Sequence, residues 1–172
     1  NPPYTDSANY GSELKAFMIA NYKKPLAFHS NLYSAFIKRN SELLNDNGKV
    51  GMIHPHTFMF IKTFEDVRKF LINNYHLNIL ADYGLDRINL FGPGILIESV
   101  IYVFENSATS KDSTFFTVTF DLQEKYKKEA LLKAIHDLVN DIDNERIYTL
   151  NQSKLKTIKS WPFIYWISDA FR

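Results

Sequence analysis

The first four residues, Asn1-Pro2-Pro3-Tyr4, combine groups that could act on a planar exocyclic amine. Such an amine, for example N6 of adenine, is a poor nucleophile because its lone pair is delocalised into the ring. The side-chain oxygen of Asn1 and the backbone carbonyl of Pro2 could accept its hydrogen bonds, which strengthen as positive charge develops during methyl transfer. Consecutive prolines fix the backbone, so Pro3 makes the loop rigid, and the ring of Tyr4 could stack on the base. The tetrapeptide therefore favours an amino methyltransferase.

The tetrapeptide by itself leaves other interpretations open. A Pro-rich string of four residues can be a simple turn. The same string occurs in enzymes that methylate the side-chain amide of glutamine, which is a similar planar nitrogen. A third interpretation is a module that binds DNA or a protein partner and performs no methylation.

The composition is that of a globular protein, with 45% hydrophobic and 23% charged residues among 172. The net charge of +1 gives no global basic field that would attract nucleic acid. The absence of cysteine excludes disulfides and thiol catalysis, and the apolar runs are too short to cross a bilayer. Because the chain begins with Asn1 rather than Met, we expect it to be part of a longer protein.

Hydrophobic periodicity predicts an alternation of helices and strands. The predicted helices cover residues 12–22, 31–44, 63–75 and 123–142, and the predicted strands cover 50–53, 77–81, 97–104, 114–120 and 146–150. Thr63 is expected to cap the third helix, with Asp66 completing a capping box. The alternation up to residue 81 predicts an open α/β sheet with parallel strands. A change of pattern near Asn106 predicts a boundary between residues 1–106 and an appended α+β region over 107–172.

Several segments in the same order make nearly the whole chain similar to one known family. It resembles the second half of the catalytic domain of adenine-specific DNA methyltransferases of the PglX type, from BREX phage-defence systems, and the related fused restriction–modification enzymes. The matching segments are Asn1 to Tyr4, Asn31-Leu32-Tyr33-Ser34-Ala35-Phe36-Ile37, Gly51-Met52-Ile53 with Thr57-Phe58-Met59-Phe60 and Phe64-Glu65-x-x-Arg68, and Tyr165-Trp166-Ile167-Ser168. Two departures stand out. Asn31 replaces the usual Asp, and Ile158-Lys159-Ser160-Trp161-Pro162 stands where the family usually has Ile-Pro-Gly-Ser-Pro.

The resemblance implies a partial Rossmann-like methyltransferase fold, comprising the second half of the sheet with an antiparallel last hairpin. It implies S-adenosylmethionine as methyl donor, with Asn1 beside the donor and the rest of the donor site upstream. Gly92-Pro93-Gly94 is not placed between a strand and a helix, so it does not fit a donor loop. We therefore expect the isolated chain to bind the donor poorly and to be inactive. Residues 1–106 would end the catalytic domain, and 107–172 would lead toward a target-recognition region.

The resemblance also implies a cytoplasmic enzyme whose partner is double-stranded DNA, with other defence proteins as further partners and no membrane contact. A target adenine must leave the base stack to reach the donor. Phe91 best fits the family's aromatic residue that faces this base from the side opposite Tyr4. Alternatively, Phe91 is a core residue of its loop and does not contact the base.

Other residues give weaker signals. His54 and His56 flank Pro55 but have no third ligand beside them, so no metal site is expected; His54 could line the cleft at the end of its strand. Lysines 125, 127, 128 and 133 are expected on the outer face of an amphipathic helix. The aromatic tail from Trp161 to Phe171 is expected to pack against a part of the protein that lies outside this chain, with base stacking as the alternative.

Overall fold

A five-stranded sheet forms the centre of the chain, with strand order β1-β3-β2-β4-β5. The computed structural model describes residues 1–85, 91, 96–107 and 113–172. The strands are β1 (Lys49–Pro55), β2 (His76–Leu85), β3 (Glu98–Glu105), β4 (Ser113–Val118) and β5 (Ile147–Asn151). The α-helices in the described residues are α1 (Ser12–Tyr22), α2 (Leu32–Glu42), α3 (Glu65–Asn74) and α4 (Glu124–Val139). The periodicity of the sequence thus predicted the type and order of these elements.

The sheet is mixed rather than purely parallel. β3 lies between β1 and β2 and is antiparallel to both, so β1 and β2 run in the same direction. β4 pairs parallel with β2, and β5 pairs antiparallel with β4. The α/β class and the expected antiparallel hairpin, formed by β2 and β3, are confirmed. The parallel strands expected before residue 81 are β1 and β2, which do run in the same direction, although β3 lies between them.

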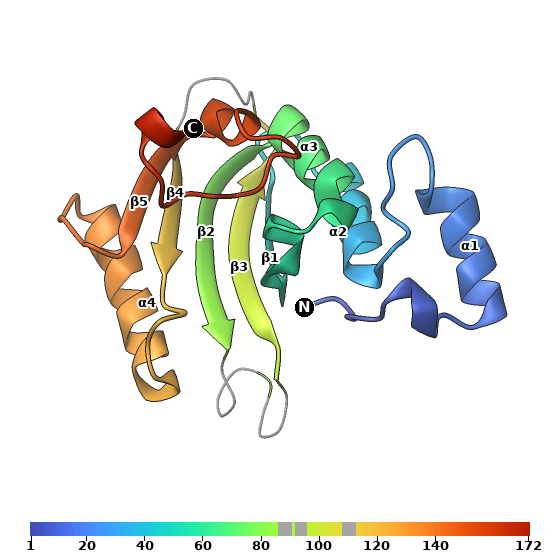
Figure 1. The fold of residues 1–172 in the computed structure, drawn as a ribbon, viewed down its shortest axis with the longest axis horizontal. Coiled ribbons are helices and arrows are strands. Elements are labelled where there is room, and N and C mark those ends of the chain that lie inside the picture. The colour runs from blue at the N-terminus through green and yellow to red at the C-terminus, as the bar shows by residue number, and fades with distance from the viewer. Residues whose placement is uncertain (86–90, 92–95, 108–112) are drawn as a thin grey trace.

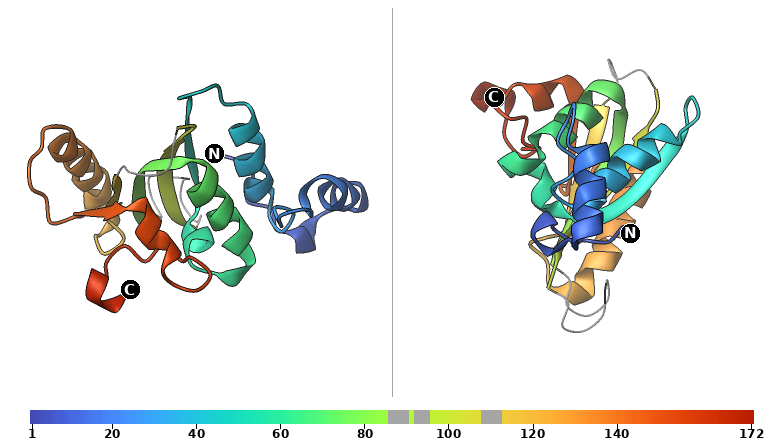
Figure 2. Two further views of the ribbon diagram at one scale, coloured as in Figure 1. Left: turned by 90° about the horizontal axis from the view of Figure 1, so that it is seen from above. Right: turned by 90° about the vertical axis from the view of Figure 1, so that its right-hand side faces the viewer.

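The helices cover the sheet from both sides. Figures 1 and 2 show α3 and the C-terminal tail on one side and α4 on the other, while α1 projects away from the sheet.

β4 and β5 continue the same sheet as β1 to β3, and the boundary near Asn106 stays a prediction. No helix among the described residues has the length and apolar character needed to cross a membrane.

Side-chain hydrogen bonds fix the start of α2 but not that of α3. The side chain of Asn31 accepts a hydrogen bond from the backbone N–H of Tyr33 and caps α2. α3 begins at Glu65 without a side-chain cap, so the predicted capping box at Thr63 is wrong. The carboxylate of Asp66 instead accepts a 2.9 Å hydrogen bond from the N–H of Ala27, which ties α3 to the segment before α2.

Part of the aromatic tail belongs to this chain's own core. Phe163 and Tyr165 are buried within this chain, so the expectation that the tail packs against a part of the protein outside it is wrong for these two residues. The ring of Phe163 meets Phe58 edge-on at 5.5 Å, and its N–H donates to the carbonyl of Met59. Trp166 and Phe171 are exposed.

Lys127 is a second correction, because it is buried although the helix pattern placed it on the outer face. Its Nζ donates a 2.7 Å hydrogen bond to the carbonyl of Tyr83. Gly84 makes room for this contact, since a Cβ on that residue would lie 3.2 Å from Nζ and 2.6 Å from the Cβ of Phe120. The neighbouring lysines 125, 128 and 133 are exposed as predicted.

The fully buried Arg68 joins the tail to the segment after β1. Its guanidinium donates to the carbonyls of Phe58 and Ile61 on one side and to those of Ser160 and Trp161 on the other. Burial lowers the pKa of Arg68 to about 10, so the group remains charged at neutral pH. One side chain therefore satisfies four backbone acceptors that lie far apart in the sequence.

The first prediction concerns Ser160, which stands at the glycine of the family's Ile-Pro-Gly-Ser-Pro signature. Its φ is +69°, a left-handed conformation that costs a non-glycine residue about 1 kcal/mol. Ser160→Gly should therefore raise the free energy of unfolding by about 0.5–1 kcal/mol in urea titrations. Ser160→Ala is the control, because it keeps the Cβ and should not stabilise. A Gly variant no more stable than the Ala variant would contradict this explanation.

The second prediction tests Arg68. Arg68→Met leaves four carbonyls without their donor, so the free energy of unfolding should fall by about 3 kcal/mol or more. The matched control is Arg39→Met on α2, where the arginine is exposed and the change should stay below about 1 kcal/mol. Equal losses in the two variants would show that the buried hydrogen bonds contribute little.

Candidate active site

The tetrapeptide Asn1 to Tyr4 lies at the carboxyl end of β1. Figure 1 shows the N-terminus beside this end of the strand. The hydroxyl of Tyr4 lies 3.2 Å from the carbonyl oxygen of Ile53 in β1, and the carbonyl of Thr5 accepts a 2.9 Å hydrogen bond from the N–H of Leu32. Ligand sites of open α/β sheets form at this edge, outside the carboxyl ends of the parallel strands.

A hydrogen bond inside the tetrapeptide orients its amide. The hydroxyl of Tyr4 donates to Oδ1 of Asn1 at 2.6 Å. Burial raises the pKa of Tyr4 to about 12, so the phenol keeps its proton and remains a donor at neutral pH. An amide oxygen has two lone pairs, and Oδ1 of Asn1 therefore retains the capacity to accept a second hydrogen bond from a ligand.

A cavity of about 410 Å³ opens beside the tetrapeptide. It is lined by Asn1, Pro2, Pro3, Tyr4, Phe91 and Ile97. The structure thus brings together all the site residues that the sequence indicated. Ile97 also lines the cavity and was not predicted from the sequence, where its only signal was its place immediately before β3.

The rings of Tyr4 and Phe91 are in direct contact. Their centroids lie 5.8 Å apart and their planes are nearly perpendicular, at 87°. A base stacked between two parallel rings needs about 7 Å, which is two van der Waals contacts. There is consequently no room for a base between these rings as they stand. A base stacked on the free face of Tyr4 would be perpendicular to Phe91, and a base between them would require Phe91 to move.

His54 has a structural role. It is fully buried, its ring stacks on Tyr33 at 4.4 Å, and its Nε2 lies 2.9 Å from the hydroxyl of Tyr102. Burial lowers its pKa to about 3, so the imidazole is neutral at physiological pH. It does not line the cavity beside the tetrapeptide; His56, two residues further, lines a separate cavity.

The described residues contain no group of three or more His, Cys, Asp or Glu side chains arranged to hold a metal ion. The string Gly92-Pro93-Gly94, considered above as a donor loop, lies outside the described residues.

Residues 1–91, more than half of the chain, match the family of the Eco57I restriction-modification methylase. The chain belongs to this family. The match begins with the tetrapeptide and ends at Phe91, so it includes both aromatic residues that line the cavity.

Two curated relatives support the more specific resemblance to PglX-type enzymes. The chain is 24% identical over 171 residues to the adenine-specific methyltransferase BrxX of Escherichia coli O9:H4 (strain HS), covering 99% of this chain. It is 27% identical over 169 residues to the adenine-specific methyltransferase PglX of Lacticaseibacillus casei (strain Zhang), covering 98%. The chain spans only 13% of the length of either relative.

Solved structures of restriction–modification proteins share the fold of this Eco57I-family chain. A DrdV–DNA complex superposes with a TM-score of 0.64 at 16% identity, covering 99% of this chain and 18% of that one. A structure of a type I restriction–modification system superposes with a TM-score of 0.63 at 14% identity, covering 100% and 37%. These likenesses confirm the methyltransferase fold.

The third prediction follows from the environment of His54. The pKa of His54 is depressed in the folded state. Below about pH 6.5 the unfolded chain therefore binds a proton at this residue and the folded chain does not, which favours unfolding. This residue alone should cost about 2 kcal/mol of stability between pH 7 and pH 5, and the loss should continue toward pH 3. Urea titrations at several pH values measure how the free energy of unfolding changes with pH.

The variant His54→Gln serves as the comparison. It removes the titrating group, so its stability should depend less steeply on pH between 7 and 5, whatever its absolute stability. Parallel slopes for the variant and the parent chain would show that His54 is not the acid-sensitive group.

Proposed function

We propose that this chain is part of a DNA adenine-N6 methyltransferase of a restriction–modification or phage-defence system. One observation carries the proposal. Asn1, Tyr4 and Phe91 line one cavity at the carboxyl edge of the sheet. A chain of the Eco57I methylase family therefore has both a hydrogen-bond acceptor and aromatic surfaces where a nucleobase could enter.

Each residue of the tetrapeptide has a separate role in this mechanism. Oδ1 of Asn1 and the carbonyl of Pro2 accept hydrogen bonds from the exocyclic amine, and both bonds strengthen as the nitrogen becomes positive. The hydroxyl of Tyr4 holds the amide of Asn1 with its oxygen fixed, and the ring of Tyr4 stacks on the base. Pro3 limits the movement of the loop.

S-adenosylmethionine is the methyl donor that the family implies. The cavity fits such a donor at one point, because Asn1, whose amide oxygen can accept a further hydrogen bond, lines it. When bound, the donor supplies the methyl group. We propose that its other contacts come from parts of the protein outside this chain. The isolated chain should then bind the donor poorly and show no activity.

Adenine in DNA is the proposed substrate. Two relatives are named as adenine-specific methyltransferases, and one structural neighbour is a complex with DNA. An adenine inside a duplex must leave the stack, and aromatic side chains stabilise an extruded base. We propose double-stranded DNA as the partner, other defence proteins as further partners, a cytoplasmic location, and Phe91 as the second aromatic contact of the base.

The fourth prediction concerns the tetrapeptide in the full-length protein. Asn1→Ala should lower kcat for adenine methylation by about 100-fold or more, because it removes an acceptor that acts in the transition state. Tyr4→Ala should lose a similar amount, whereas Tyr4→Phe should lose less because it keeps the stacking ring. Methyl incorporation into DNA and into protein substrates is measured side by side.

Two controls accompany these variants. Asn9→Ala and Phe17→Ala change exposed residues away from the cavity and should leave methylation unchanged. Normal adenine methylation by the Asn1→Ala protein would overturn the proposed role of the tetrapeptide. Incorporation into protein rather than DNA would assign the cavity to a glutamine amide.

A further inference from the structure

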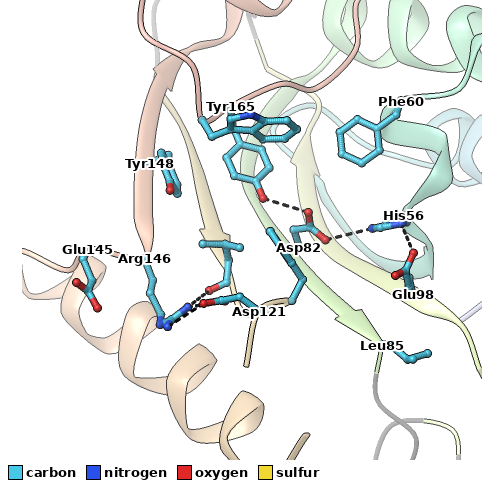
Figure 3. A pocket seen from close by; sticks show the side chains of 13 residues that line it. His56, Phe60, Asp82, Leu85, Glu98, Asp121, Glu145, Arg146, Tyr148 and Tyr165 are labelled. Atoms are coloured by element: carbon cyan, nitrogen blue, oxygen red, sulfur yellow. Dashed lines mark hydrogen bonds and ion pairs between the residues drawn. The ribbon is translucent and has the colours of Figure 1, made fainter. Parts of the chain in front are cut away.

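A second and larger cavity lies on the sheet face covered by the tail. Its volume is about 710 Å³, within the range of ligand-binding cavities. Figure 3 shows side chains from β2, from the segment after β1 and from the tail converging on it. Asp82 of β2 lies at its centre, between His56 and Tyr165. No residue of the tetrapeptide takes part, so this cavity is separate from the proposed methylation site.

The imidazole of His56 contacts two carboxylates in this cavity. Nδ1 of His56 lies 3.3 Å from the buried carboxylate of Asp82, and its Nε2 lies 2.8 Å from the carboxylate of Glu98. The hydroxyl of Tyr165 donates a 3.0 Å hydrogen bond to Asp82 without adding charge. Even when the imidazole is protonated, two negative charges face one positive charge.

The other cation in the cavity does not correct this excess. Arg146 binds both carboxylate oxygens of Asp121, at 2.8 and 3.3 Å, and the two charges neutralise each other. Glu145 lies at the exposed side of the cavity and forms no ion pair within the described part of the chain. The cavity therefore carries a net negative charge whatever the protonation state of His56.

Aromatic rings form the walls around these carboxylates. The ring centroids of Phe60 and Trp166 lie 6.0 Å apart, and those of Tyr165 and Trp166 lie 5.0 Å apart. Trp166 is 50% exposed, so part of its ring is free to contact a ligand. Aromatic faces attract cations, and a cation between them and a carboxylate is stabilised by both.

Carboxylates beside aromatic rings favour a cationic ligand over a phosphate or an apolar side chain. A nucleic-acid phosphate would meet an excess of carboxylates, and an apolar side chain would cover them without supplying the positive charge that they lack. A cation satisfies both the carboxylates and the rings. A guanidinium suits the site better than an ammonium, because it is planar, is more weakly hydrated and stacks on aromatic rings while it binds a carboxylate.

We propose that this cavity is a docking site for an arginine side chain presented by a partner protein. The guanidinium binds the carboxylates of Glu98 and Asp82 and stacks on the ring of Trp166. This role does not depend on the proposed methylation, and it gives the protein a contact through which another protein could attach beside the sheet.

The experiment is a calorimetric titration of the full-length protein with the peptide acetyl-Gly-Arg-Gly-amide. The matched peptide carries citrulline, which has nearly the shape of arginine but no charge. We expect the arginine peptide to bind at least tenfold more tightly than the citrulline peptide. Equal binding of the two peptides, or no binding of either, would overturn the proposal. Displacement of the arginine peptide by a single-stranded oligonucleotide would also overturn it, by assigning the cavity to nucleic acid.

Substitutions of the groups that contact the guanidinium should weaken binding of the arginine peptide. Glu98→Gln removes a negative charge and Trp166→Leu removes a ring, so each should weaken binding of the arginine peptide by about two- to fivefold. Glu129→Gln on the exposed face of α4 is the control and should have no effect. Loss of affinity in the control as great as in Glu98→Gln would contradict a specific site. Thermal unfolding checks that each variant is folded.

His56 tests whether the charge of the cavity controls the affinity for the arginine peptide. Its hydrogen bond with Asp82 raises the pKa of His56, and the nearby charges of Asp82 and Glu98 act in the same direction against desolvation. Loss of its proton at higher pH increases the negative charge of the cavity, so the arginine peptide should bind more tightly. The other titratable groups that face the cavity are Asp82, Glu98, Asp121, Glu145, Arg146, Tyr148 and Tyr165. Among these side-chain types and His56, imidazole is the one that ordinarily titrates between pH 5 and 8.

The variant His56→Gln removes this titration. It should bind the arginine peptide at least as tightly as the parent protein at pH 6, and its affinity should change less between pH 6 and 8. A purely structural role for His56 predicts weaker binding of the peptide at every pH. That result would contradict the charge argument and overturn the proposal.

Discussion

The guanidinium of Arg68 joins the tail to the segment after β1, alongside the packing of Phe163 on Phe58. Four carbonyls, from residues on both sides of the helix that carries it, accept its hydrogen bonds. A buried charge is tolerated only where its donors are satisfied, so the tail must return to this point for the core to close. The position of the tail then places Phe163 against Phe58 and Tyr165 against Asp82. The second cavity therefore depends on a residue that does not line it.

Both cavities lie where strands of the same direction end, although different residues form them. The tetrapeptide contacts Ile53 near the end of β1, and Asp82 is near the end of β2. β3 begins between these two strand ends, with Ile97 lining one cavity and Glu98 lining the other. Successive side chains of an extended segment point to opposite sides, which explains how two adjacent residues can contribute to separate sites.

The polar chemistry of the two cavities is different in kind. The cavity beside the tetrapeptide offers neutral acceptors and aromatic rings, which suit an uncharged amine on a planar ring. The second cavity offers carboxylates in excess of cations, again beside aromatic rings. The charge of this cavity, rather than its shape, makes it selective for a protein ligand over nucleic acid. A phosphate would be repelled where a guanidinium is attracted.

The sequence by itself determined the helices, the strands and the tetrapeptide, because hydrophobic periodicity and a rigid Pro-Pro string act between near neighbours. It also indicated Phe91, through resemblance to a family rather than through its own pattern. Only the tertiary structure decided that β3 inserts between β1 and β2, that Lys127 and Phe163 are buried, and that Tyr165 meets Asp82, 83 residues away. These contacts depend on the order of strands and on the return path of the tail, and a local pattern contains no information on which distant segment will become its neighbour.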